Sequence, residues 1–172
     1  GGGVARFFPE QWQRFAGLLP EEERGDIIGA YARRLFSDDS TEQVRHARAW
    51  AAWENALASI AGNGAGGESA AEYARAFARI ENHYFRHLGW LERDGQILDN
   101  MPLISHIPGT VVQGRYDMIC PPTGAWRLTR RWPRAKLRMV GMAGHAISET
   151  GITEALVETT DGIARQAPRY GF

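Results

Sequence analysis

The chain has 172 residues, of which 44% are hydrophobic and 23% are charged, and its formal net charge is zero. That length suffices for one domain with a sizeable core, and the balanced charge favours neither a nucleic acid nor an acidic membrane as a partner. Cys120 is the single cysteine, which excludes an internal disulfide and fits a reducing compartment, so we expect a cytoplasmic protein. No apolar run reaches the roughly 18 residues that a membrane-spanning helix needs.

The first hundred residues predict helices separated by turns. Apolar spacing and helix-start signals place these helices at about 9–18, 20–35, 42–60 and 69–88. Polar residues at 37–41 are expected to supply an N-cap, and Ser69 is expected to cap the last of the four helices. The string Gly62–Gly67 matches G-x-G-x-x-G, but it follows a helix rather than a strand, so it predicts a flexible loop instead of a dinucleotide site.

The pattern changes after residue 100. Short β-rich runs at 110–114 and 136–140 alternate with helical runs at 122–132 and about 152–165. This order is typical of α/β structure, in which parallel strands are joined by a crossover helix. We therefore expect a helical region at 1–100 and an α/β region at 101–172. Two strands do not make a stable open sheet, so further strands are expected from elsewhere.

An acidic and an imidazole side chain follow the two predicted strands. Asp117 comes just after the first strand, and Gly144-His145 comes just after the second. Each is common at such a place by itself. Together, in this order, they predict the acid and the base of a catalytic triad, because parallel strands present their following loops at one edge of the sheet.

Two carboxylates lie within aromatic stripes of predicted helices. Glu54 shares a helix face with Trp50, Trp53 and Leu57. Glu81 belongs to a second stripe, whose other members are Tyr73, Phe77, Ile80, Tyr84, Phe85 and Leu88. A buried carboxylate must be paired or protonated. The partner is either a nearby arginine, from among Arg48, Arg75, Arg79 and Arg86, or a cationic substrate such as an amine.

A metal site is not expected. His83 and His87 are spaced to ligate a metal from one helix face, but the sequence shows neither an adjacent acid of the H-E-x-x-H kind nor a third ligand.

Five segments of the chain resemble a known family, the prolyl iminopeptidases. The segment 112–121 resembles the Asp segment of these α/β-hydrolases, and Ala143-Gly144-His145 with Ser148-Glu149 resembles their His segment. Segments 49–54 and 78–85 resemble motifs of their helical cap, and segment 8–12 resembles the entry into that cap.

The resemblance implies a partial α/β-hydrolase fold, in which a helical cap (1–100) is followed by the last strands and helices of the parallel sheet (101–172). By this resemblance Asp117 and His145 are the triad acid and base, and Glu54 and Glu81 bind the imino group of the substrate. The implied activity is that of a serine aminopeptidase that releases N-terminal proline from peptides, through an acyl-enzyme and without a metal or an organic cofactor.

The sequence departs from the family by lacking a nucleophile elbow. No Gly-x-Ser-x-Gly string occurs, and the nearest approach, around Ser69, has no strand before it. The chain also starts at Gly1, without an initiator Met. We therefore expect the C-terminal portion of a hydrolase that requires an N-terminal portion and is inactive alone. The alternatives are a non-catalytic remnant that binds amines or peptides, and a hydrolase of another ester or amide.

Overall fold

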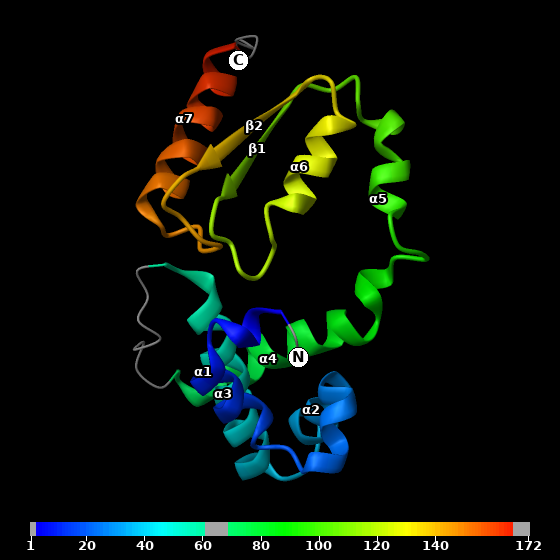
Figure 1. Cartoon of the computed structure of the whole chain (residues 1–172), viewed down its shortest axis with the longest axis vertical. Helices are drawn as coiled ribbons and strands as arrows, with labels where there is room; N and C mark the ends of the chain where they lie inside the picture. Colours follow the sequence, from blue (N-terminus) through cyan, green and yellow to red (C-terminus); the bar gives the residue numbers. More distant parts are fainter. Residues whose placement is uncertain (1–2, 61–68, 167–172) are drawn as a thin grey trace, which may run out of the picture. The chain divides into compact units, whose positions relative to one another are not determined.

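The computed structural model describes residues 3–60 and 69–166, and this part of the chain falls into two compact units (Figure 1). The helical unit comprises residues 1–57 and 61–94, and the sheet unit comprises residues 58–60 and 95–172. The predicted loop Gly62–Gly67 lies outside the described residues.

Within its described residues, the helical unit is built from four α-helices. They are α1 (Pro9–Ala16), α2 (Ile27–Leu35), α3 (Ser40–Ala58) and α4 (Ala71–Arg86), with 3-10 turns at Val4–Arg6, Glu21–Asp26 and Leu88–Trp90. The helix predicted over 20–35 is divided at Asp26, because its carboxylate accepts a hydrogen bond from the Gly29 amide and caps α2. The expected cap of the third helix is confirmed, since Asp39 accepts hydrogen bonds from the amides of Thr41 and Glu42.

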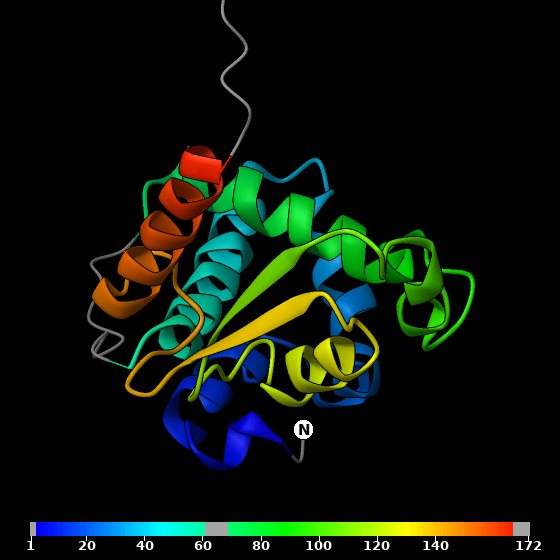
Figure 2. The ribbon, with the colours of Figure 1, turned by 90° about the horizontal axis from the view of Figure 1, so that it is seen from above.

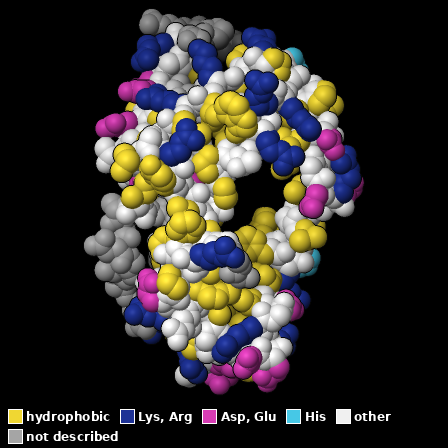
Figure 3. Space-filling view, viewed as in Figure 1, with side chains coloured by type: hydrophobic (Ala, Val, Ile, Leu, Met, Phe, Trp, Pro, Cys, Tyr) yellow, Lys and Arg dark blue, Asp and Glu magenta, His cyan; other side chains and the backbone are white. Residues whose placement is uncertain are grey.

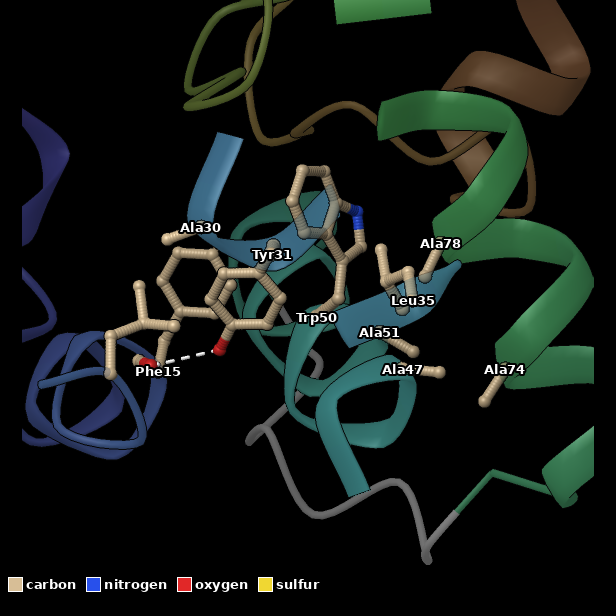
Figure 4. Packing of buried hydrophobic residues seen from close by; sticks show 10 residues of the cluster. Phe15, Ala30, Tyr31, Leu35, Ala47, Trp50, Ala51, Ala74 and Ala78 are labelled. Carbon is tan, nitrogen blue, oxygen red and sulfur yellow. Dashed lines mark hydrogen bonds between the residues drawn. The ribbon is translucent and has the colours of Figure 1, made fainter. Parts of the chain in front are cut away.

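The core of this unit is a cluster of aromatic rings surrounded by alanines (Figure 4). Phe15 and Tyr31 stack with their ring centroids 4.5 Å apart, and Trp50 meets both rings edge-on. The Tyr31 hydroxyl donates a 2.8 Å hydrogen bond to the Phe15 carbonyl, which is the dashed line in Figure 4. All three rings are at most 5% exposed, so they lie within the buried core of the unit.

The fully buried positions of helix α4 are small residues, and from its aromatic stripe Phe77 packs partly buried against the core. Its buried positions are Ala74, Ala78 and Asn82, and the Asn82 amide donates to the Ile28 carbonyl of α2. Most members of the stripe are exposed; those that are at least 46% exposed are Tyr73, Ile80, Tyr84, Phe85 and Leu88. Helices that approach closely need small side chains at the contact, and the i, i+4 alanines provide them.

The N-cap predicted for α4 is also wrong. The helix begins at Ala71 with Ala70 at the cap position, and no side chain caps it. The Ser69 carbonyl instead accepts a hydrogen bond from the Arg48 guanidinium. This bond satisfies a carbonyl before the helix, whereas no side chain accepts from the first amides of α4.

The sheet unit alternates strands and helices. Its elements are α5 (Gln96–Asp99), a 3-10 turn (Met101–Leu103), β1 (Gly109–Gly114), α6 (Thr123–Arg130), β2 (Ala135–Val140) and α7 (Thr150–Gln166). The two strands pair in parallel, from Gly109 opposite Ala135 to Gly114 opposite Val140, which confirms the predicted crossover through a helix. Figures 1 and 2 show α6 and α7 on opposite faces of the strand pair.

Both strands are only partly buried along most of their length. Apolar side chains also reach the surface of both units, as the yellow groups in Figure 3 show. No helix in the described ranges combines the length and the apolar character that crossing a membrane would require.

Candidate active site

Asp117 lies in the loop that follows β1 and is 7% exposed. Its Oδ1 atom accepts hydrogen bonds from the amides of Ile119 (3.0 Å) and Cys120 (2.7 Å). These amides fix the carboxylate as part of a tight turn, because Asp side chains readily bond to the backbone two and three residues onward. Oδ2 is thereby left facing the second loop of the site.

His145 lies in the loop that follows β2, and its ring reaches Asp117. The Nδ1 atom is 3.0 Å from Asp117 Oδ2, and 41% of the His145 side chain is exposed. A carboxylate at Nδ1 places the proton on that nitrogen and leaves Nε2 as the basic atom. The structure thus brings together the two residues that the strand pattern paired, in the geometry that an acid–base pair requires.

Gln113 is a third contributor that the sequence did not reveal. Its side-chain amide donates to Asp117 Oδ2 at 3.1 Å and to the Cys120 carbonyl at 3.1 Å. Gln113 is the penultimate residue of β1, so a rigid element carries the amide that orients the carboxylate. A polar side chain at the end of a partly buried strand was the only available signal.

The two loops approach closely at Gly114. The amides of Arg115 and Tyr116 donate to the carbonyls of Val140 and Ala143, both at 2.9 Å. A Cβ atom at Gly114 would lie 1.9 Å from the Gly144 carbonyl oxygen, so only glycine permits this approach.

The His145 loop is also tied to the segment 58–60. The amides of His145 and Ala146 both donate to the Ala58 carbonyl at 2.8 Å. The Glu149 carboxylate accepts from the Gly144 amide and from the Ile60 amide, again at 2.8 Å each. The backbone on both sides of the imidazole is therefore fixed by hydrogen bonds.

The predicted carboxylates Glu54 and Glu81 belong to the helical unit and lie on α3 and α4. Both are partly buried. The indole N–H of Trp50, a residue that is 2% exposed, donates a 2.8 Å hydrogen bond to Glu81 Oε2. A buried tryptophan thus orients one oxygen of this carboxylate.

Three further residues that the sequence singled out, Arg79, His83 and His87, have contacts of their own. Arg79, one of the four arginines, donates to the Leu35 carbonyl at 2.8 Å and lies over the Phe36 ring. His83 and His87 have ring centroids 4.5 Å apart, and the His87 ring stacks on Trp90. Among the described residues no group of three or more His, Cys, Asp or Glu side chains could hold a metal ion.

Residues 2–152 match the family described as alpha/beta hydrolase fold, and the chain belongs to this family. Within it, the chain is similar to curated proline iminopeptidases. It is 41% identical over 164 residues to the proline iminopeptidase of Xanthomonas citri, covering 94% of this chain and 52% of that protein. It is 45% identical over 159 residues to that of Arabidopsis thaliana, covering 91% of this chain and 42% of the relative.

A probable proline iminopeptidase of Leptolyngbya boryana is 42% identical over 166 residues, covering 95% of this chain and 52% of that protein. The chain thus spans about half the length of the curated relatives it matches. The resemblance inferred from the five segments is confirmed, and so is the partial α/β-hydrolase fold.

Proposed function

We propose that this chain supplies the substrate cap and the acid–base pair of a serine aminopeptidase that releases N-terminal proline from peptides. The observation that carries the proposal is the 3.0 Å contact of His145 Nδ1 with Asp117 Oδ2, in a chain that is 41–45% identical to proline iminopeptidases. We assign residues 1–100 to the cap and 101–172 to the hydrolase domain, and the lone cysteine favours a cytoplasmic location.

His145 acts as the base in this mechanism. Its Nε2 takes the proton from a serine hydroxyl that the preceding portion of the enzyme supplies, while the serine oxygen attacks the prolyl carbonyl. The imidazolium then returns the proton to the leaving amine, and water repeats the cycle on the acyl-enzyme. Asp117 holds the imidazole in the reactive tautomer and stabilises its positive charge.

Glu54 and Glu81 bind the secondary ammonium of the N-terminal proline. Two carboxylates neutralise this cation, and the Trp50 indole fixes one oxygen of Glu81 in place. A substrate that lacks the free amine cannot make this interaction with the two carboxylates, which gives selectivity for a free N-terminus.

The test of the acid–base pair uses the complete enzyme and a proline anilide. Asp117→Asn is expected to lower kcat by about 10⁴-fold, because the imidazole loses its correct tautomer. The matched control is Asp161→Asn, which changes an exposed side chain of α7 in the same unit and is expected to leave kcat unchanged. Full activity of Asp117→Asn would overturn the proposed mechanism.

The test of substrate selection compares a proline amide with a simple ester. Glu54→Gln and Glu81→Gln are expected to raise KM for the amide while hydrolysis of the ester stays unchanged, because only the amide carries an ammonium group. Glu72→Gln, at an exposed position of α4, is the control. Equal losses on both substrates would favour a hydrolase of another ester or amide. Binding of proline peptides without turnover by the complete protein would favour a non-catalytic binding protein.

A further inference from the structure

We infer that Glu149 is a positioning residue for His145: its carboxylate fixes the backbone of the histidine loop against the segment 58–60 and thereby sets the imidazole for proton transfer. The inference rests on the proposed function, since it assigns Glu149 a part in the same reaction. Glu149 does not touch the reacting atoms and acts through the loop.

Both oxygens of the Glu149 carboxylate are used. Oε2 accepts from the Gly144 amide at 2.8 Å, directly before His145, and Oε1 accepts from the Ile60 amide at 2.8 Å. Gly144 is five residues away in the sequence, whereas Ile60 is 89 residues away. One side chain therefore joins the catalytic loop to a remote segment of backbone. Hydrogen bonds to an ionised acceptor are about twice as strong as neutral ones.

Hydrogen bonds join the His145 loop to residues 58–60 both through Glu149 and directly. The His145 and Ala146 amides both donate to the Ala58 carbonyl at 2.8 Å, parallel to the link through Glu149. The Ser59 hydroxyl also donates to the Glu149 carboxylate. Residues 144–146 and residues 58–60 are thus joined by several hydrogen bonds, which fix the backbone before and after His145.

The arrangement favours a charged Glu149. Partial burial by itself raises the pKa of this carboxyl, but hydrogen bonds from the Gly144 and Ile60 amides and the Ser59 hydroxyl outweigh it and hold the pKa below its usual range. An ionised carboxylate offers only acceptor sites, which suits three donors. A glutamine has one acceptor oxygen and an NH₂ group. The NH₂ group would face one of the two backbone N–H groups, and that hydrogen bond would be lost.

The loop has little room to adjust. A Cβ atom at Gly144 would lie 3.0 Å from the Ala58 carbonyl oxygen and 3.3 Å from Glu149 Oε1. Because Gly144 lies so close to Ala58 and Glu149, we expect the loss of one Glu149 acceptor oxygen to displace the backbone of Gly144 and His145. A displacement of about 1 Å at a catalytic group can cost on the order of 100-fold in rate.

The experiment compares Glu149→Gln with Glu154→Gln in the complete enzyme. Glu154 is an exposed residue of α7, so its variant makes the same chemical change away from the loop. Glu149→Gln is expected to lower kcat by about 10- to 100-fold while KM changes by about twofold or less, because geometry in the transition state is affected and substrate binding is not. Glu149→Asp, which keeps two acceptor oxygens, is expected to recover part of the loss.

A second readout follows the contact of His145 with Asp117 without relying on turnover. The imidazole Nδ1 proton gives a downfield proton resonance, which is expected to shift or broaden in Glu149→Gln and to stay unchanged in Glu154→Gln. Unchanged kcat together with an unchanged resonance in Glu149→Gln would overturn the inference. A loss of activity in which KM rises and the resonance stays in place would overturn it as well.

The outcomes separate this inference from the proposed function. If the wild-type enzyme does not cleave proline substrates, the proposed function fails, and the imidazole resonance alone decides the role of Glu149. If Glu149→Gln does not fold, Ser59→Ala removes only one donor and is expected to lower kcat by about two- to fivefold at unchanged KM. Unchanged kcat in Ser59→Ala would in that case overturn the inference.

Discussion

The interactions that stabilise the interior of the helical unit differ from those that stabilise the sheet unit. In the helical unit, stacked and edge-on aromatic rings fill a core in which Trp50 is 2% and Tyr31 is 0% exposed. In the sheet unit the two strands are mostly half-buried, and the residues around His145 are fixed by hydrogen bonds between loops. Its buried hydrophobic residues are Met101, Ala125, Ala143, Ile152 and Ala155.

This difference shows which kind of change each unit is sensitive to. A packed aromatic core loses stability when a side chain is truncated, because the protein then buries less apolar surface and loses van der Waals contacts around the cavity. Loops that approach through backbone hydrogen bonds are disturbed instead when volume is added. The proposed catalytic pair therefore depends on hydrogen bonds between loops, whereas the carboxylates proposed to bind the ammonium lie on helices that depend on core packing.

Removing the indole of Trp50 is expected to give the largest effect. Trp50→Ala should lower the unfolding free energy by about 3–5 kcal/mol, since it empties the centre of the aromatic cluster. Urea unfolding followed by circular dichroism measures the change. Trp126→Ala is the control, because Trp126 is 56% exposed and its loss should cost about 0.5 kcal/mol or less.

Trp50→Phe separates packing from orientation of the carboxylate. It keeps a ring in the core but removes the indole N–H, from which Glu81 accepts a hydrogen bond. Equal stability losses in Trp50→Ala and Trp126→Ala would contradict the contrast between core and surface.

Adding one methyl group at Gly114 is expected to give the next largest effect. In Gly114→Ala the new Cβ meets the Gly144 carbonyl oxygen at 1.9 Å, so the two loops must separate, at a cost of about 1–3 kcal/mol. Gly124→Ala is the matched control: the space at this position of α6 is open, and alanine should stabilise the helix by up to about 1 kcal/mol. The melting temperatures of the two variants should shift in opposite directions, and a shift in the same direction would refute the close approach.

The features predictable from sequence are those that follow from periodicity and topology. Two β-rich runs separated by a helical run imply parallel strands, and parallel strands place the loops of Asp117 and His145 together. The contribution of Glu149 could not be predicted in this way, because its partner Ile60 is 89 residues distant and hydrogen bonds to remote backbone have no periodic signature. Gln113 was not predicted either, although its partners Asp117 and Cys120 are near in sequence, because hydrogen bonds within one turn also leave no periodic signature.

The aromatic stripe of α4 shows how a periodic signal can mislead. Tyr73 and Tyr84 have the spacing of a buried face, yet they are 59% and 53% exposed. The buried positions of α4 are instead Ala74, Ala78 and Asn82, and small alanine side chains carry little weight in a hydrophobicity pattern. Helix position was therefore predictable, whereas the buried face was not.

Removing the phenol oxygen of Tyr31 is expected to have a smaller effect. Tyr31→Phe keeps the stacked ring but leaves the buried Phe15 carbonyl without its donor, at a cost of about 1 kcal/mol. Burial raises the pKa of Tyr31 above its ordinary value of 10.0. The unfolded chain therefore ionises first, and the wild type should lose stability above pH 10.0 while Tyr31→Phe loses less. Unfolding midpoints at pH 7 and pH 10.5 test this, and identical losses would contradict it.

The smallest effect is expected at the surface of the helical unit, where Glu23 pairs with Arg34 at 2.6 Å and Arg33 at 2.8 Å. Hydrogen bonds from Arg34 and then Arg33 lower the pKa of Glu23 from 4.5 to about 2. Since the folded value lies below the unfolded one, the stabilisation is complete above pH 4.5 and disappears as the pH falls toward 2.

The difference in urea midpoint between the wild type and Glu23→Gln should accordingly narrow between pH 5 and pH 3. Added salt should narrow it as well, because exposed ion pairs are screened. Glu22→Gln changes an exposed neighbour and should give a midpoint that follows the wild type across this range. If the urea-midpoint difference between the wild type and Glu23→Gln stayed the same at low pH, packing rather than charge would account for the contribution of Glu23 to stability.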